Sequence, residues 1–302
     1  MNPKSLMRRG IRSRIRTYAF IALLAFCVGV SAQSAEVYRG QGLFGEILVY
    51  DDQDGFRVME FARGAARQSL VRLNDPLHIE FEYARIALVS VAFSRQPPRR
   101  VLVMGLGGGT LPVFFHRTYP DVLIDVVEID PEVVRISKRY FNVEEDQRLR
   151  IHVGDGRDFL EKVSAETYDI IILDAFGASE VPIHLRTQEF LRAVRRALRP
   201  DGVSVSNIWG PTANASYFDM MATHHSVFDE IYAVQTVKNV NVLVFGLAQQ
   251  QRLTRTDVAF RVASIPERSL ARYRLEEAVR SGWSEAGLAA HQGRILRDAT
   301  LR

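Results

Sequence analysis

A shortage of cysteine is the first feature of this 302-residue chain, whose only cysteine, Cys27, lies in an apolar stretch near the N-terminus. A disulfide needs two cysteines, and thiol catalysis needs one in the folded site, so we expect neither after that stretch. An excess of one charge is also missing, since 39 lysines and arginines face 35 aspartates and glutamates. No basic stripe interleaved with aromatic residues occurs, and the sequence therefore predicts no nucleic-acid partner.

Long apolar runs are missing as well, because the run from Thr17 to Val30 is shorter than the about 20 residues that span a bilayer as a helix. Arginines precede this run, and small residues from Ser31 to Ala35 follow it. That order is typical of a secretory signal peptide. We therefore expect residues 1–35 to export the protein to the periplasm or the medium. An uncleaved membrane anchor, and a downstream start that leaves the protein in the cytoplasm, are the alternatives.

Short β patterns dominate residues 36–75. Two runs typical of strands, Gly45 to Tyr50 and Phe56 to Phe61, flank the turn from Asp51 to Gly55. Aspartate and glycine between two such runs are typical of a β-hairpin. The pattern predicts a small N-terminal β-hairpin lid.

Strands and helices alternate through residues 76–250, which predicts an α/β fold with a doubly wound, Rossmann-like sheet. The strands are expected at residues 101–104, 124–127, 149–153, 170–173 and 203–207, followed by an antiparallel pair at 231–236 and 240–246. The helices are expected at residues 76–93, 131–141, 158–163, 187–198 and 218–228. Residues 251–302 form a polar tail, in which helices are expected over 269–280 and 285–297.

A glycine-rich turn follows the first strand of this sheet. Gly105, Gly107, Gly108 and Gly109 come directly after the strand, and glycine lets backbone N–H groups approach a ligand closely. The next strand ends in Glu128, about 20 residues past the turn, where an acid can bind a ribose diol. The turn therefore favours nucleoside binding, although a merely tight connection between strand and helix is the alternative.

Acidic residues stand at the ends of three predicted strands, namely Glu128, Asp155 and Asp174. Ligands of such sheets bind at the carboxyl ends of the strands. Two of the carboxylates can hold a ribose diol and an adenine amino group, which leaves Asp174 free to meet the reacting group. For Asp155 a purely structural role as a helix N-cap is the alternative.

Four segments of this region resemble the spermidine synthase (polyamine aminopropyltransferase) family, a branch of the class I S-adenosylmethionine-dependent transferases. They are residues 127–133, 137–141, 154–159 and 168–174. Upstream, Gln68-Ser69 and the group of Asp75, His78 and Glu80 are similar to the family's glutamine and to its segment of acid, tyrosine, histidine and glutamate. The resemblance covers residues 45–245 and implies a methyltransferase-type sheet.

The resemblance also implies roles for particular residues. Gln68 would contact the nucleoside, Glu128 the ribose hydroxyls, and Asp155 with Gly156 the adenine. The turn that carries the nucleoside would consist of Gly105, Gly107 and Gly109. Asp174 would be the catalytic proton acceptor.

The implied reaction moves an aminopropyl group from decarboxylated S-adenosylmethionine to a small-molecule amine. Because amines are protonated near pH 7, a carboxylate must take a proton before or during the attack. The co-substrate is decarboxylated or intact S-adenosylmethionine, and no metal is expected. A homodimer is what the family suggests.

Two glycines depart from the family pattern. Gly108 and Gly177 stand where the family carries acids that hold the amine, so the acceptor half of the site is altered. Transfer of a methyl or other group from S-adenosylmethionine to a non-polyamine acceptor is therefore one alternative. A non-catalytic nucleoside-binding protein is the second.

Four further side chains are candidates for binding the acceptor or the amino-acid end of the co-substrate: His78, Glu80, Glu180 and Trp209. For His78 and Trp209, packing in the core is the alternative. His224 and His225 lack the partner spacing of a metal site and are expected on a helix surface.

Overall fold

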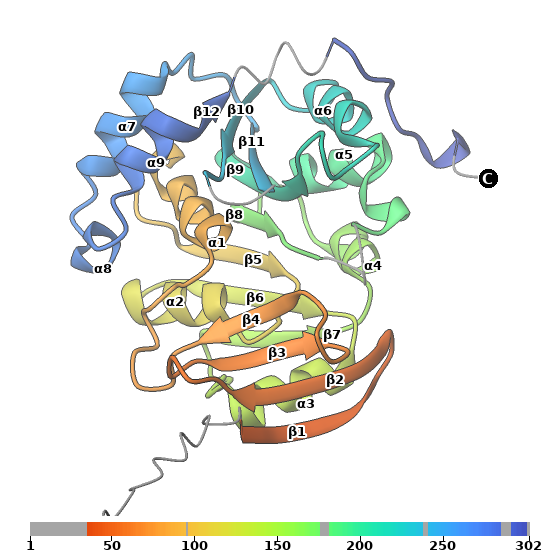
Figure 1. Cartoon of the computed structure of the whole chain (residues 1–302). Coiled ribbons are helices and arrows are strands. Elements are labelled where there is room, and N and C mark those ends of the chain that lie inside the picture. The colour runs from red at the N-terminus through yellow and green to blue at the C-terminus, as the bar shows by residue number, and fades with distance from the viewer. Residues whose placement is uncertain (1–34, 95, 176–180, 238–240, 285–290, 301–302) are drawn as a thin grey trace, which may run out of the picture. The chain divides into compact units, whose positions relative to one another are not determined.

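The computed structural model describes residues 35–94, 96–175, 181–237, 241–284 and 291–300 (Figure 1). Residues 1–34 of the expected targeting segment lie outside the described residues, as do Gly177 and Glu180. Among the helices that are described, none combines the length and the apolar character that a membrane span requires.

An eight-stranded sheet is the centre of the fold, with the strand order β12-β10-β11-β9-β8-β5-β6-β7. Its strands are β5 Arg100–Met104, β6 Leu123–Glu128, β7 Leu149–Val153, β8 Tyr168–Leu173, β9 Leu198–Trp209, β10 Glu230–Gln235, β11 Asn241–Leu247 and β12 Trp283–Ser284. Strands β5 to β9 pair in parallel, whereas β11 pairs antiparallel with β9 and with β10. The predicted doubly wound α/β fold with a closing antiparallel pair is therefore confirmed.

Helices cover both faces of the sheet. They are α1 Glu82–Ala87, α2 Thr110–Thr118, α3 Pro131–Tyr140, α4 Gly156–Lys162, α5 Gln188–Ala197, α6 Tyr217–His225, α7 Arg255–Ala263, α8 Arg268–Ala271 and α9 Leu275–Gly282, with 3-10 turns η1 Leu88–Phe93, η2 Ile183–Leu185 and η3 Asp298–Thr300. Successive side chains of a strand point to opposite faces. In β5, Val101 and Val103 pack in one core with α1 to α3, α7 and α9, while Leu102 and Met104 pack in another with α4 and α5. Residues 101–104 of β5 are therefore apolar on both faces of the strand.

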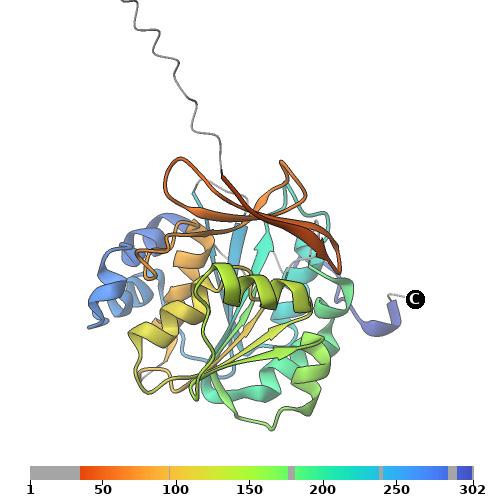
Figure 2. The same cartoon turned by 90° about the horizontal axis from the view of Figure 1, so that it is seen from below.

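The N-terminal lid is a four-stranded antiparallel sheet. Its strands, in spatial order, are β1 Ala35–Gly42, β2 Gly45–Asp51, β3 Arg57–Phe61 and β4 Arg67–Val71. Strands β2 and β3 form the predicted hairpin, and β1 and β4 extend it on both sides. Buried Ile47, Val49 and Met59 belong to the same core as β5, so the lid packs on the main sheet, and Figure 2 shows it above the yellow-green α3.

Two helix predictions for the tail are wrong. The helix expected over residues 269–280 is divided into α8 and α9, because Arg274 adopts the left-handed conformation with φ of 46°. The helix expected over 285–297 is not present in its described part, residues 291–297, where Leu296 instead pairs with the backbone of Gln188. Likewise, the helix expected from residue 76 begins only at Glu82.

Asp130 joins the lid to the main sheet. This residue is 3% exposed and lies two positions after Glu128. Its Oδ1 accepts a hydrogen bond from Glu132 N at 2.8 Å as the N-cap of α3, and its Oδ2 accepts one from Leu43 N at 2.7 Å in the β1–β2 turn. One carboxylate therefore starts a helix and anchors the lid.

We expect Asp130→Ala to lower the free energy of unfolding by about 2–4 kcal/mol, because both donors lose a buried charged acceptor. Urea unfolding measures the loss, and hydrogen exchange should show faster opening of the β1–β2 amides. Thr254→Ala is the matched control, because Thr254 caps only α7 and its loss should cost about 1 kcal/mol. Equal losses for the two variants, with unchanged exchange in β1–β2, would contradict this role.

Candidate active site

The candidate site lies at the carboxyl ends of β5, β6 and β8, beside the last residues of the parallel strand β9. Met104 of β5 stands opposite Val127 of β6 and Leu173 of β8, and Leu173 stands opposite Ser206 of β9. The residues that come next are Gly105, Glu128, Asp174 and Asn207. The register of the sheet therefore assembles residues that are up to about a hundred positions apart in the chain.

The glycine turn needs glycine for conformation and for space. Gly105, Gly107 and Gly109 have φ of 94°, 50° and 77°, a region that other residues rarely adopt. A Cβ on Gly105 would lie 2.5 Å from the backbone oxygen of Asp174, and one on Gly107 would lie 2.7 Å from Ser69 Oγ. The turn thus packs directly against the end of β8 and against the lid strand β4.

Glu128 is 9% exposed and holds the glycine turn through its carboxylate. Oε2 accepts a hydrogen bond from Leu106 N at 2.9 Å, and Oε1 accepts one from Asp130 N at 2.9 Å. Burial raises the pKa of Glu128 and outweighs the lowering effect of these backbone donors. Since a carboxylate offers about four lone-pair positions, the group can hold the turn and still accept from a diol.

Asp155 is the N-cap of α4, so the structural role that the sequence left open is present. Oδ1 accepts from Arg157 N at 2.8 Å and from Asp158 N at 3.2 Å. Oδ2 is left for another partner and accepts from His184 Nε2 at 2.8 Å. Burial alone would raise the pKa of Asp155, but the donors together lower it. Gly156 follows as the first residue of the helix.

Asp174 is held between two donors at the end of β8. Asn207 Nδ2 donates to Oδ1 at 2.9 Å, and the hydroxyl of Tyr83 from α1 donates to the same carboxylate. Burial raises the pKa of Asp174 from 3.8 to about 6, although both donors oppose this shift. A carboxylate in this environment is ionised at neutral pH and can still accept a proton.

Gln68 and Ser69 lie on β4, next to the glycine turn. Gln68 Nε2 donates to Ala66 O at 3.3 Å, and Ser69 Oγ accepts from Gly108 N at 2.7 Å. The space around Gly108 is filled, because a Cβ there would lie 2.9 Å from Phe141 and 3.0 Å from Ser69. An acid at this position would therefore require the surrounding side chains to move.

The remaining candidates lie in different surroundings. His78 Nε2 lies 2.8 Å from Glu80 Oε2, and its ring packs on the ring of Phe56, at 5.6 Å between centroids. Trp209 ends β9 and, by strand alternation, lies on the same side as Asn207. The structure therefore places Trp209 on the same strand face as Asn207, and pairs His78 and Glu80 with each other.

The prediction that His224 lies on a helix surface is wrong. His224 is 2% exposed, with Nδ1 2.7 Å from Met220 O and Nε2 2.9 Å from Ser206 Oγ. Burial lowers its pKa to about 4, so the ring is neutral and structural. Within the part of the chain that the structure describes, no three histidine, cysteine, aspartate or glutamate side chains gather as a metal site.

Three polar residues of the site were not predicted: Tyr83, Asn207 and His184. Asn207 had a usable signal, because a polar residue at the end of an apolar strand beside Asp174 should face the same ligand. Tyr83 reaches Asp174 from a helix before the main sheet, and His184 comes from a short turn. No local sequence pattern predicts either contact.

We expect the stability difference between wild type and Asp174→Asn to depend on pH between about 4 and 6. In that interval the folded wild type binds a proton that the unfolded chain has released, because the pKa of Asp174 is raised from 3.8 to about 6. The wild type should therefore lose stability relative to the variant as pH rises, by on the order of 3 kcal/mol, with no further change above pH 7. Urea unfolding at a series of pH values measures this, and a constant difference would refute the raised pKa.

Comparison with known proteins identifies the family. Residues 80–249 match the model of the spermine/spermidine synthase domain. The chain is 36% identical over 215 residues to a polyamine aminopropyltransferase from Vibrio vulnificus, which covers 70% of each chain.

Two solved structures share the fold. One is a probable spermidine synthase from Corynebacterium glutamicum, with 22% identity, a TM-score of 0.66, and 78% of this chain and 93% of that chain covered. The other is human methyltransferase-like protein 13 in complex with SAH, with 25% identity, a TM-score of 0.54, and coverage of 68% and 96%. With its glycine turn, its three acids at strand ends and the matching domain, the chain belongs to the spermine/spermidine synthase family.

Proposed function

We propose that this protein is an aminopropyltransferase that moves an aminopropyl group from decarboxylated S-adenosylmethionine to an amine. The observation that carries the proposal is Asp174, an ionisable carboxylate with a pKa of about 6 that is held by Tyr83 and Asn207. It lies against the glycine turn, so a nucleoside bound there would present its reacting group to a proton acceptor. Membership of the family supports the same reaction.

The strand ends fit an adenine nucleoside. Glu128 can accept from the ribose hydroxyls, and Asp155 and Gly156 lie at the next strand end for the adenine. Between the two acids, Ile129 and Val153 are 39% and 56% exposed although they are apolar. Exposed apolar residues beside placed polar groups are typical of a ligand site. Gln68 and the turn glycines complete the nucleoside half of the proposal.

Asp174 acts on the amine. The bound sulfonium supplies a carbon that an amine nitrogen can attack, with the sulfur leaving as a neutral thioether. Asp174 takes a proton from the amine, while Tyr83 and Asn207 keep its carboxylate oriented. The new C–N bond forms as the C–S bond breaks, so the only proton to be moved is the one on the nitrogen. Orientation on a rigid strand end adds to the rate.

Methyl transfer is the second candidate, and Gly108 is the observation that favours it. Gly108 offers no carboxylate that would hold an amine, and an acid in its place would crowd Phe141 and Ser69. A human methyltransferase is among the solved structures with this fold. The two candidates differ in the donor, which is decarboxylated S-adenosylmethionine for aminopropyl transfer and intact S-adenosylmethionine for methyl transfer. For either reaction, the residues proposed to bind the acceptor are His78, Glu80, Glu180 and Trp209.

We expect the purified protein to form spermidine from putrescine and decarboxylated S-adenosylmethionine, as measured by mass spectrometry. Asp174→Asn should lower kcat by about 10²- to 10⁴-fold, because the amine loses its proton acceptor. In the wild type, kcat/KM should decrease below about pH 6 as Asp174 becomes protonated. The control is Asp158→Asn, which removes an exposed carboxylate from α4 and should leave kcat unchanged.

A binding measurement tests the choice of co-substrate independently of the acceptor. Methylthioadenosine at 100 times its dissociation constant should stabilise both wild type and Asp174→Asn by about 2.7 kcal/mol. Transfer of a methyl group from intact S-adenosylmethionine, without aminopropyl transfer, would support the second candidate. Absence of both products and of any stabilisation would overturn both candidates.

Export remains part of the proposal. We infer from the basic, apolar and small-residue segments that residues 1–35 direct the chain out of the cytoplasm. Such an enzyme would need its co-substrate carried out or supplied locally. Cell fractionation with N-terminal sequencing should find a chain that begins after residue 30 outside the cytoplasm, and an intact Met1 in the cytoplasm would contradict export. The homodimer that the resemblance implies stays a prediction.

A further inference from the structure

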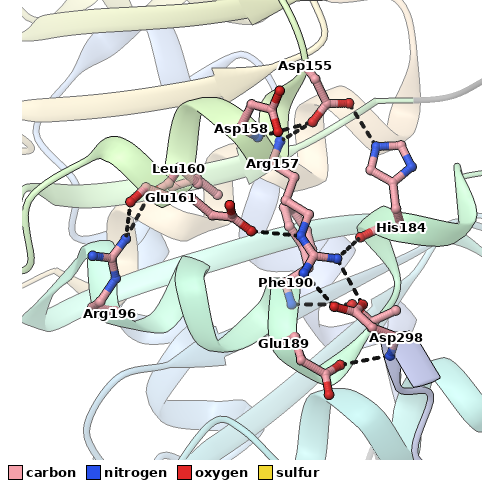
Figure 3. A network of polar contacts seen from close by, with 11 residues as sticks. Asp155, Arg157, Asp158, Leu160, Glu161, His184, Glu189, Phe190, Arg196 and Asp298 are labelled. Atoms are coloured by element: carbon pink, nitrogen blue, oxygen red, sulfur yellow. Dashed lines mark hydrogen bonds and ion pairs between the residues drawn. The ribbon is translucent and has the colours of Figure 1, made fainter.

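A series of polar contacts leads from the C-terminal segment to Asp155 (Figure 3). His184 Nε2 lies 2.8 Å from Asp155 Oδ2, and Arg157 Nη1 donates to the backbone oxygen of His184 at 3.3 Å. The guanidinium of Arg157 also forms a bidentate pair with Asp298, at 2.8 and 2.6 Å. His184 is thus tied to α4 twice, through its ring to the N-cap and through its carbonyl to Arg157.

The C-terminal segment, residues 291–300, has its own anchors on α5 and α6. Leu296 accepts from Gln188 N at 2.8 Å and donates from its N to Thr223 Oγ1 at 2.9 Å. Arg294 N donates to Asp219 Oδ1 at 2.7 Å. Asp298 therefore reaches Arg157 from a segment that is fixed along two helices.

We propose that His184 is a positioning residue that orients the Asp155 carboxylate toward the nucleobase, and that Asp298 of the C-terminal segment holds His184 in place through Arg157. The inference rests on the proposed function, because it assigns the nucleobase to Asp155. It adds a base-selecting role for η2 and for the end of the chain.

The two oxygens of Asp155 have different tasks. Oδ1 is occupied by the first N–H groups of α4, and the His184 Nε2–H fixes Oδ2. An ionised carboxylate only accepts hydrogen bonds, so an oriented Oδ2 attracts a 6-amino group and repels a 6-oxo group. Adenine nucleosides are thereby selected over hypoxanthine nucleosides. Both side chains remain accessible to a ligand, with 25% of Asp155 and 46% of His184 exposed.

Asp298 and Arg157 give His184 its fixed place. Arg157 is 20% exposed at its side chain, and its planar guanidinium matches the carboxylate of Asp298 with two donors. The same guanidinium holds the backbone of His184, so loss of Asp298 leaves Arg157 with Glu161 as its carboxylate partner and weakens the hold on η2. The ring of His184 then no longer restrains Oδ2.

The test measures how strongly the full chain prefers methylthioadenosine over methylthioinosine, from the dissociation constants of both by calorimetry. His184→Ala should lower the preference by about tenfold, since one charge-assisted hydrogen bond is lost. His184→Gln, which keeps a donor near the position of Nε2, should restore most of it. His184→Ala should raise KM for the nucleoside substrate more than His184→Gln does, and both variants should change kcat little, because His184 touches no reacting atom.

Asp298→Asn should lower the same preference by a few-fold, because its pair with Arg157 is weakened. Asp219→Asn is the matched control, since it loosens the same segment at Arg294 without touching Arg157, and it should leave the preference unchanged. If the wild type binds methylthioadenosine but His184→Ala has the same preference as the wild type, the inference is overturned and the proposed function is not. A wild type that binds neither nucleoside would overturn the proposed function and the inference with it.

Discussion

The close backbone approach between Gly105 and Asp174 is the constraint on which the site depends. Strands β5 and β8 pair in register up to Met104 and Leu173, so the next residues of both strands meet at the sheet edge. A side chain at position 105 would overlap the Asp174 carbonyl. In addition, Gly105 has a φ of 94°, a backbone conformation that residues other than glycine rarely adopt. The glycine turn and Asp174 are therefore parts of one packed unit.

Three carboxylates at this edge acquire different properties from different partners. Burial raises the pKa of Glu128 while two backbone donors hold it in place. The N-terminal N–H groups of α4 and His184 lower the pKa of Asp155. Asp174 has a pKa of about 6, because burial outweighs its two side-chain donors. The same chemical group, a carboxyl, thus has a raised pKa at Glu128 and Asp174 and a lowered pKa at Asp155, which suits the three roles that we propose for them.

Local patterns predicted the sheet and its acids, because apolar runs, glycines and strand ends are properties of short segments. The partners of those acids could not be predicted in this way. Asn207 reaches Asp174 across 33 positions of sequence, and Asp298 reaches Arg157 across 141. The polar tail was expected to be helical in parts, but the backbone groups of Arg294 and Leu296 pair with α5 and α6 instead. Such pairing depends on tertiary structure, which periodicity does not contain.

A crystal structure of the complex with methylthioadenosine tests the account most directly. We expect the ribose hydroxyls on Glu128, the 6-amino group on Asp155 Oδ2 beside His184, and the thioether sulfur facing Asp174. A nucleoside bound away from the glycine turn, or bound with its sulfur remote from Asp174, would contradict the assignment of this sheet edge as the active site.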